Sequence, residues 1–304
     1  MKHRGIALSS DGAMLFGSGK VSIMRHDGIV KGALALAAVA LLNGGVNSAC
    51  AQDQSAASAA NPTAVDKMKL PPGYLAREAL PDSLALLPPP PTKGSAAMKR
   101  DEEARKAARK LRGTPRYARA TSDAVIGFPQ IPDDFACAMG LPIAKDATPK
   151  LYALMGRMLI DVGLSTYGAK NKYQRTRPFV VHKEATCYPK DEALLRNDGS
   201  YPSGHSAIGW GLALVLAELN PDNANALLQR GRDFGQSRVV CDAHWQSDVE
   251  AGRAIASATV ARLHGDAAFR ADMDAARGEV AAAKQAGAKP ATDCAAEAAS
   301  LATP

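Results

Sequence analysis

A histidine at the start of an apolar segment is the first residue whose type and position could do chemistry. His205 opens the run HSAIGWGLALVLAEL, directly after Pro202, Ser203 and Gly204. A helix that begins here presents unpaired N–H groups and a positive potential, which together bind anions. Gly204 lets the backbone approach a ligand closely, and Ser203 can donate its hydroxyl. His205 is either a proton donor or a hydrogen-bonded structural histidine, and other parts of the chain must decide between the two.

A second histidine is spaced to meet a carboxylate. His244 and Asp248 are four residues apart, so on a helix they share one face. A carboxylate that accepts from the imidazole Nδ1–H leaves the Nε2 lone pair pointing outward, as a nucleophile or an oriented base requires. A metal site and a plain helical His–Asp pair are the alternatives. The metal site is disfavoured because the other candidate residues are Lys and Arg, which repel a metal ion.

Three cations complete the set of candidate residues. Lys170 and Arg177 are seven residues apart, so we expect them on one face of a helix that ends at Pro178. They form either a solvated surface or a clamp for an oxyanion, which the planar guanidinium fork can bind through two hydrogen bonds. Arg238 is a further candidate ligand for an oxyanion. Together the three predict a site for a phosphate-like anion.

The elements that must position these residues are predicted to be helices. Apolar residues recur at helical spacing between Thr148 and Pro178, and the sequence patterns predict further helices. These are expected at about 204–219, 221–236, 244–264 and within 266–287. An earlier helix, from an N-cap at Ser95 to about Leu111, is charged on one face, which we interpret as solvated surface. No segment alternates with a period of two, so residues 95–285 are predicted to form a single all-α helical bundle.

The two ends of the chain are predicted to lie outside this bundle. Residues 1–51 resemble a secretory signal, with a basic stretch, a short apolar run and a small-residue cleavage site ending at Ala51. Met24 is then an alternative start, and a lipoprotein signal through Cys50 is a weaker interpretation. Residues 52–94 are expected to be flexible and proline-rich, with the prolines extended along the body. The C-terminal tail is expected to be residues 286–304.

Composition restricts the compartment and the partners. The chain has a net charge of +7, and removing residues 1–51 takes away five basic and two acidic residues, which leaves +4. This mild charge, without an extended basic stripe, argues against nucleic acid as a partner. Beyond the signal, no apolar run is long enough to span a membrane. In an exported protein an even number of cysteines predicts two disulfides, in one of three pairings, with free thiols as the alternative. The four cysteines beyond the signal are Cys137, Cys187, Cys241 and Cys294.

The candidate residues fall into three blocks whose order and spacing resemble the signature of the type 2 phosphatidic acid phosphatase superfamily. The blocks are Lys170 to Pro178, Pro202 to His205, and Ser237 to Asp248. The segments PDSLALLPPPP, GSYPSGHSAIGW and GQSRVVCDAHWQSDVEAGR further resemble class A bacterial non-specific acid phosphatases. The resemblance covers roughly residues 73–268, and every motif position is occupied.

The resemblance implies a secreted or periplasmic, metal-independent acid phosphatase with a phosphohistidine intermediate. Its fold would be the helical bundle that acid phosphatases share with vanadium-dependent haloperoxidases. By position, His244 is the nucleophile, Asp248 orients it, and His205 is the general acid and later the base for water. The implied phosphate ligands are Lys170, Arg177, Ser203, Gly204 and Arg238. The implied substrates are phosphate monoesters, the implied inhibitors are phosphate and vanadate, and no cofactor is expected.

Two other functions remain open from the sequence. A vanadium-dependent haloperoxidase would use the same cations, because vanadate bound to a histidine mimics the phosphoryl transition state. A non-catalytic periplasmic phosphate-binding protein would explain the cations but not the pair of His244 and Asp248. Nearby cations should depress both histidine pKa values, while Asp248 and bound phosphate should raise them, and we expect a pH optimum of about 5–7. The substrate alcohol is not determined by the sequence, and neither is the oligomeric state, for which a homo-oligomer is left open.

Overall fold

Residues 71–302 are described by a computed structural model, and within them all regular secondary structure is helical. This confirms the all-α prediction. The predicted signal sequence and residues 52–70 lie outside the described residues. The helices from the N-terminal side are η1 (Arg77–Ala79), α1 (Ser83–Leu86), α2 (Ala96–Arg109), α3 (Pro115–Ser122), α4 (Gln130–Met139), α5 (Pro149–Leu164), α6 (Tyr167–Tyr173), α7 (Pro178–Val181), η2 (Pro189–Asp191) and α8 (Glu192–Leu195). They continue with α9 (Gly204–Leu219), η3 (Pro221–Asn223), α10 (Ala224–Val240), α11 (Gln246–Leu263), α12 (Ala267–Gln285) and α13 (Cys294–Leu301).

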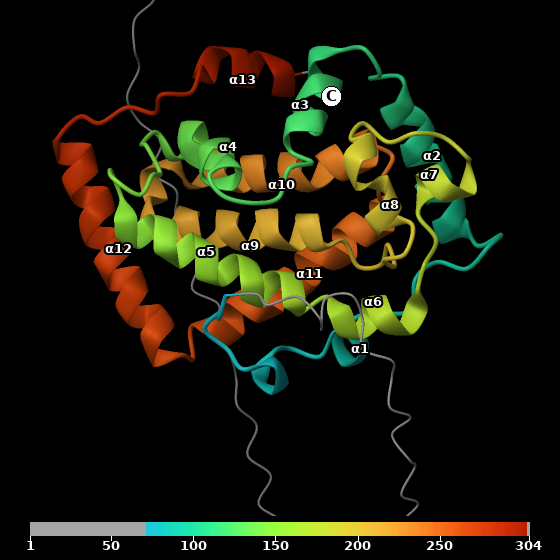
Figure 1. Cartoon of the computed structure of the whole chain (residues 1–304), viewed down its shortest axis with the longest axis horizontal. Helices are drawn as coiled ribbons and strands as arrows, with labels where there is room; N and C mark the ends of the chain where they lie inside the picture. Colours follow the sequence, from blue (N-terminus) through green and yellow to red (C-terminus); the bar gives the residue numbers. More distant parts are fainter. Residues whose placement is uncertain (1–70, 303–304) are drawn as a thin grey trace, which may run out of the picture. The chain divides into compact units, whose positions relative to one another are not determined.

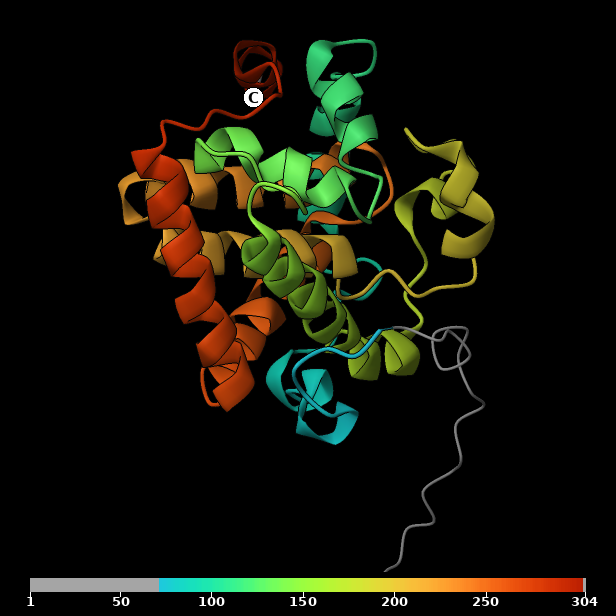
Figure 2. The same cartoon turned by 60° about the vertical axis from the view of Figure 1, so that its left-hand side comes forward.

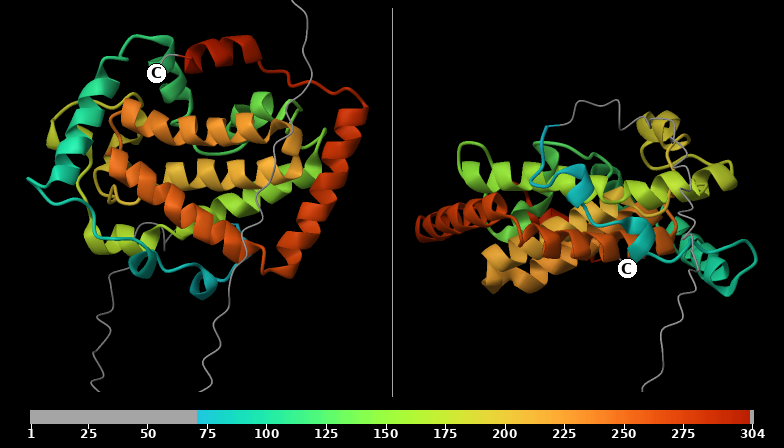
Figure 3. Two further views of the ribbon diagram at one scale, coloured as in Figure 1. Left: turned by 180° about the vertical axis from the view of Figure 1, so that it is seen from behind. Right: turned by 90° about the horizontal axis from the view of Figure 1, so that it is seen from below.

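Helix α9 is the central helix of the described bundle. Helix α10 runs alongside it, α5 crosses it on one side and α11 on the other (Figures 1 and 3). Its side chains are buried on most of its circumference, which matches an apolar sequence without a polar face. The predicted bounds of this helix, 204–219, are confirmed, because Ser203 caps its N-terminus and accepts from the Ser206 N–H.

The N-termini of α9 and α11 lie directly against each other. The Ser203 N–H donates to the Asp248 carbonyl oxygen at 2.9 Å. A β-carbon at Gly252, one turn further along α11, would overlap the Ser203 carbonyl oxygen, so only glycine permits this approach. Two helix starts that are far apart in the sequence are thereby held at one point.

The prediction of one continuous helix from Thr148 to Pro178 is wrong, because the segment forms two helices. Helix α5 ends at Leu164, α6 covers Tyr167–Tyr173, and Gln174 then has a left-handed φ of 42°. At the first break, the hydroxyls of Ser165 and Thr166 donate to backbone carbonyls three residues earlier, which competes with the helical hydrogen bonds. Arg177 is extended, as expected for the residue before a proline, so it does not share a helix face with Lys170.

The segment before α10 also differs from its prediction. Residues 221–223 form the 3-10 turn η3, and α10 itself runs from Ala224 to Val240, four residues beyond the predicted end. The extension is stabilised by burial of Val239 and Val240, which are 2% and 4% exposed. Arg238 therefore lies in the last turn of a helix rather than in a loop.

The proline-rich and C-terminal segments both pack on the bundle. Pro88 to Pro91 have no helical structure, and the Tyr201 hydroxyl donates to the Pro88 carbonyl at 2.7 Å, as expected for an extended segment laid on the body. Beyond α12 the chain returns to place α13 beside α3 (Figures 1 and 2). Two disulfides are present, Cys137–Cys294 and Cys187–Cys241, which decides among the three pairings.

Removing the Cys137–Cys294 bridge should destabilise the fold. The bridge joins cysteines 157 residues apart and anchors α13 to α4. Restricting so long a loop in the unfolded chain corresponds to roughly 2–5 kcal/mol of unfolding free energy. The Cys137→Ser, Cys294→Ser double variant should therefore unfold at lower urea concentration, measured by far-UV circular dichroism. As a control, reductant should lower the urea midpoint more in the wild type, which has two bridges, than in this variant, which has one. A variant whose urea midpoint equals that of the wild type would contradict the prediction.

Candidate active site

The eight predicted site residues converge at the ends of five helices. Lys170 lies on α6, Arg177 caps α7, and Arg238 lies in the last turn of α10. The others lie at the adjacent starts of α9 and α11, or just before them: Ser203, Gly204, His205, His244 and Asp248. The three cations lie close enough to the histidines that Lys170, Arg177 and Arg238 each lower the pKa of both.

His244 is buried and its tautomer follows from its partners. Arg177 Nη1 lies 2.9 Å from His244 Nε2, and because a guanidinium only donates, Nε2 must accept and carries no proton. The neutral ring therefore holds its proton on Nδ1, which faces Asp248 Oδ2 at 3.4 Å. This is the arrangement predicted for an oriented nucleophile, with a long contact to the carboxylate.

The prediction that His244 and Asp248 share a helical face is wrong in its local geometry. Helix α11 begins only at Gln246, and Trp245 is an extended N-cap. The reason is that Asp248 Oδ2 accepts from the Trp245 N–H at 2.8 Å, which ends the helix at its N-terminal side. His244 thus reaches the same carboxylate from a loop.

His205 is held by a backbone carbonyl. Its Nε2 lies 3.0 Å from the Ala124 oxygen, and since a carbonyl only accepts, Nε2 is the protonated nitrogen. The ring also stacks on Phe234 of α10, with centroids 6.4 Å apart and planes inclined by 21°. Nδ1 is the ring nitrogen that this hydrogen bond leaves available.

Lys170 and Arg177 share one carboxylate that the sequence analysis missed. Asp198 Oδ2 lies 3.3 Å from Lys170 Nζ and 3.0 Å from Arg177 Nη2. Lys170 also donates to the Gly199 carbonyl at 2.7 Å, and Arg177 donates to the Ala243 carbonyl at 3.1 Å. These contacts fix both cations in place; the only local signal for Asp198 was its position just before the GSYPSGH motif.

Arg238 is the cation with the clearest capacity to take an external anion. It is 1% exposed, yet its Nε and Nη1 atoms are buried without a hydrogen-bond partner. Buried donors are nearly always satisfied, so an unsatisfied guanidinium marks a place for a missing acceptor. A β-carbon at Gly204 would meet only the Thr166 hydroxyl, at 3.9 Å, so the start of α9 is open to a close ligand.

Burial dominates the electrostatics of the site. Burial, followed by Arg177, lowers the pKa of His244 well below its ordinary range, and burial with Arg238 does the same to His205. Burial lowers the pKa of Lys170 to about 8 against the opposing effect of Asp198, and that of Arg238 to about 10. Burial raises the pKa of Asp248 to about 6 despite Arg175. The cation effect expected from the sequence is present, with desolvation as the larger cause.

Helix α2 was interpreted from the sequence as solvated surface, and Lys99, Arg100, Glu103 and Lys106 are indeed exposed. Two of its charged residues, Asp101 and Arg105, are instead buried and paired near the site. Arg175 Nη1 contacts Asp248 Oδ1 at 2.6 Å and its Nη2 contacts Asp101 Oδ2 at 2.7 Å. Arg105 holds both oxygens of Asp242 at 2.7 Å, which keeps that residue at a left-handed φ of 61° two positions before His244. The paired charges explain the burial, because charged side chains leave water only when they find partners.

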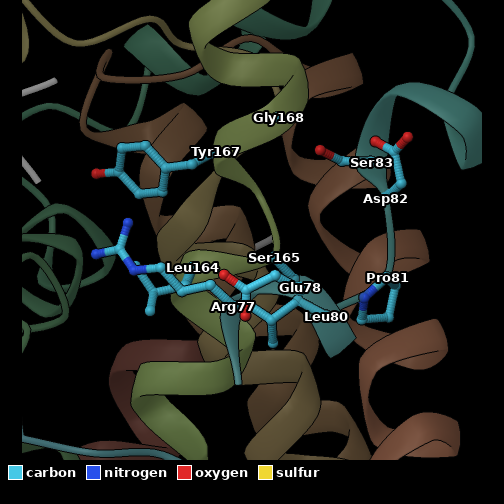
Figure 4. Close-up of a pocket in the computed structure, with 10 residues that line it drawn as sticks. All are labelled: Arg77, Glu78, Leu80, Pro81, Asp82, Ser83, Leu164, Ser165, Tyr167 and Gly168. Atoms are coloured by element: carbon cyan, nitrogen blue, oxygen red, sulfur yellow. The ribbon is translucent and has the colours of Figure 1, made fainter. Parts of the chain in front are cut away.

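A pocket lies at the N-terminal end of α6. It has a volume of about 320 Å³ and is bounded by η1, the start of α1, the end of α5 and the start of α6 (Figure 4). None of the eight predicted site residues lines it. Tyr167 does line it, and its ring centroid lies 5.8 Å from Lys170 Nζ.

Within residues 71–302, no group of three or more His, Cys, Asp or Glu side chains is placed to hold a metal ion. No helix in the same range is long and apolar enough to cross a membrane.

Arg238→Met should weaken anion binding and stabilise the unliganded protein. The change removes a desolvated charge that has two unpaired nitrogens, so we expect the unfolding free energy in phosphate-free buffer to rise by about 1 kcal/mol. Inhibition constants for phosphate and vanadate should rise about 10²-fold. Arg157→Met is the matched control, because Arg157 pairs with Asp272 and the Gly73 carbonyl, away from the site. Arg157→Met should lower the unfolding free energy and leave the inhibition constants for phosphate and vanadate unchanged. If those constants are unchanged in Arg238→Met as well, Arg238 is not an anion ligand.

Comparisons with known proteins place the chain in a family. The sequence profile of the PAP2 superfamily matches residues 150–269. A non-specific acid phosphatase of Providencia stuartii is 45% identical over 213 residues, covering 70% of this chain and 86% of the relative. An acid phosphatase of Zymomonas mobilis is 46% identical over 203 residues, with 67% and 77% covered, and a non-specific acid phosphatase of Salmonella typhimurium is 43% identical over 195 residues, with 64% and 78% covered. The chain therefore belongs to the PAP2 superfamily, within its class A bacterial acid phosphatases.

Proposed function

We propose that this protein hydrolyses phosphate monoesters by transferring the phosphoryl group to His244 and then to water. The observation that carries the proposal is the hydrogen bond from Arg177 to His244 Nε2. It keeps an unprotonated imidazole nitrogen beside the three buried cations, one of which has unsatisfied donors. Acid phosphatase relatives with 43–46% identity support the same reaction class.

The first step forms one bond and breaks another at phosphorus. The Nε2 lone pair of His244 attacks phosphorus and the ester P–O bond breaks. The leaving oxygen takes a proton from Nδ1 of His205, which in this mechanism is doubly protonated when the phosphate dianion is bound. Asp248, facing Nδ1–H of His244 at 3.4 Å, stabilises the charge that develops on the nucleophile. The result is a phosphohistidine and a free alcohol.

The second step returns the enzyme to its starting state. His205, now neutral at Nδ1, accepts a proton from the attacking water, and the P–N bond to His244 breaks. Lys170, Arg177 and Arg238 remain on the equatorial oxygens throughout, together with the Ser203 hydroxyl and the Gly204 N–H. Phosphoryl transfer needs positioning and charge stabilisation more than covalent assistance. Three fixed cations supply that charge, which supports a metal-independent reaction.

The testing experiment is a substrate screen in the presence of a chelator. Purified protein in EDTA should hydrolyse nitrophenyl phosphate, glycerol phosphate and a nucleoside monophosphate, and vanadate should inhibit competitively. Loss of activity in EDTA with recovery on adding a divalent ion would overturn the metal-independent mechanism. Bromide oxidation by peroxide in vanadate-loaded protein, without monoester hydrolysis, would instead identify a haloperoxidase, and phosphate binding without turnover would identify a binding protein.

Activity should be highest on the acidic side of neutral pH. The lowered pKa of His244 keeps the nucleophile neutral in weak acid. The pKa of His205 is lowered as well, so the free protein loses the proton on Nδ1 below the ordinary range, and in this proposal the bound phosphate dianion raises that pKa again. Above about pH 8 Lys170 also loses its charge, so KM should increase. Profiles of kcat/KM against pH for glycerol phosphate test this, and a maximum in clearly alkaline buffer would refute it.

The two disulfides support an exported location. Cys137–Cys294 and Cys187–Cys241 form and persist in oxidising compartments such as the periplasm or the extracellular medium. The predicted signal sequence at residues 1–51 agrees with this proposal. Fractionation of cells expressing the full chain, followed by N-terminal sequencing of the product, tests both the location and the cleavage after Ala51.

A further inference from the structure

A buried carboxylate behind the site connects two of its residues. Asp123 is fully buried at the C-terminus of α3 and lies next to Ala124, whose carbonyl holds His205. Its Oδ2 accepts from the Ser237 hydroxyl at 2.5 Å, and Ser237 directly precedes Arg238 on α10. One side chain therefore fixes the backbone on both sides of the site.

The surroundings of Asp123 are an extensive buried ion network. Arg230 of α10 donates to both of its carboxylate oxygens, at 2.6 and 3.2 Å, and Arg116 Nη1 donates to the Ser237 hydroxyl oxygen at 2.9 Å. Glu297 of α13 contacts Arg230 at 3.3 Å, so the helix anchored by the Cys137–Cys294 disulfide completes the network. Desolvated charges in such a network hold a defined geometry, because moving any one of them leaves another unpaired.

Among residues 71–302, no buried carboxylate contacts the side chain of His205 or Arg238 directly. His205 is held by the Ala124 carbonyl and by stacking on Phe234, which is one turn before Arg238 on the same helix. Arg238 has two unpaired nitrogens, so its position depends on the backbone of α10. The separation between α3 and α10 therefore sets where the proton donor and the phosphate ligand lie relative to each other.

We propose that Asp123 is a positioning residue for phosphoryl transfer, which sets His205 through the Ala124 carbonyl and Arg238 through Ser237. The inference rests on the proposed function, in which Nδ1 of His205 protonates the leaving oxygen. A displacement of about 1 Å at a reacting group can cost about 10²-fold in rate. The rate should decrease most for esters whose leaving group needs a proton, and little for esters whose leaving group departs as an anion.

The test compares leaving groups in Asp123→Asn and Ser237→Ala. In Asp123→Asn we expect kcat/KM for glycerol phosphate to fall about 10- to 100-fold more than kcat/KM for nitrophenyl phosphate. The inhibition constant for inorganic phosphate should also rise about tenfold, through Arg238. Ser237→Ala, which keeps the pair of Asp123 and Arg230, should change both quantities in the same direction by a smaller factor. If Asp123→Asn does not fold, the Ser237→Ala variant still tests the proposal.

Asp161→Asn is the matched control. Asp161 is equally buried and accepts from the Tyr74 and Leu75 amides, away from the site residues. It should lower the melting temperature without altering the ratio between the two substrates. The inference is overturned if Asp123→Asn and Ser237→Ala also leave that ratio unchanged while His205→Ala alters it. If His205→Ala leaves the ratio unchanged as well, the proposed acid role itself fails, so the two failures are distinguishable.

Discussion

His244→Ala should abolish both turnover and the covalent phosphoenzyme, with a loss of at least about 10⁴-fold in kcat. The expected size follows from the proposed role of Nε2 as the attacking atom, since no other unprotonated nitrogen is described in contact with Arg177. Asp248 cannot substitute, because both its oxygens are engaged, one by Arg175 at 2.6 Å and the other by the Trp245 N–H at 2.8 Å.

Rapid quenching in alkali during turnover of a radiolabelled monoester measures this directly. Phosphohistidine survives alkali, so label should remain on the wild-type protein and be absent from His244→Ala. His264→Ala is a suitable control, because His264 is 40% exposed and pairs with Glu218 at 3.2 Å, outside the site. Label retained on the His244 variant at the wild-type level would assign the nucleophile elsewhere.

His205→Ala should separate substrates by their leaving groups. Protonation by a positioned acid is worth about 10²–10⁴ in rate, and we expect that loss for glycerol phosphate. Nitrophenolate leaves without protonation, so hydrolysis of nitrophenyl phosphate should fall less than about tenfold. The Ala124 carbonyl is expected to lose its hydrogen bond in this variant, and its backbone position is retained through the adjacent Asp123.

The measurement is a series of monoesters of graded alcohol pKa. Plotted against that pKa, log kcat/KM should fall steeply for His205→Ala and only shallowly for the wild type. The His264→Ala variant should follow the wild-type line. Parallel lines for His205→Ala and the wild type would mean that another group donates the proton.

The fold was predictable wherever local sequence decides the outcome. Helix α9 was assigned to the residue, because an apolar run begins after a serine N-cap and ends just before Pro221. The break between α5 and α6 was not, because hydroxyl groups of Ser165 and Thr166 fit a helix equally well when they face solvent. The cap of α11 was missed because Asp248 serves both the helix start and His244.

The sequence predicted part of the site's membership and little of its geometry. The structure brings the eight predicted residues together, and it adds Asp198 and Arg175, which the sequence analysis did not single out. The pairing of Arg175 with Asp101 and Asp248 could not be foreseen, since its partners lie 74 and 73 residues away. A charged helix face such as that of α2 looks the same in sequence whether water or opposite charges cover it, and only the tertiary fold separates the two cases.

The contact between Arg177 and His244 has a consequence for the resting enzyme. The Nε2 lone pair of His244 accepts a guanidinium proton from Arg177, at 2.9 Å. Alkylating agents and transition metals attack the same lone pair, so we expect this contact to protect His244 from both. Phosphate oxygens are stronger acceptors for a guanidinium than a neutral imidazole is. In the proposed mechanism, the substrate would therefore draw Arg177 away and free the nitrogen that attacks it.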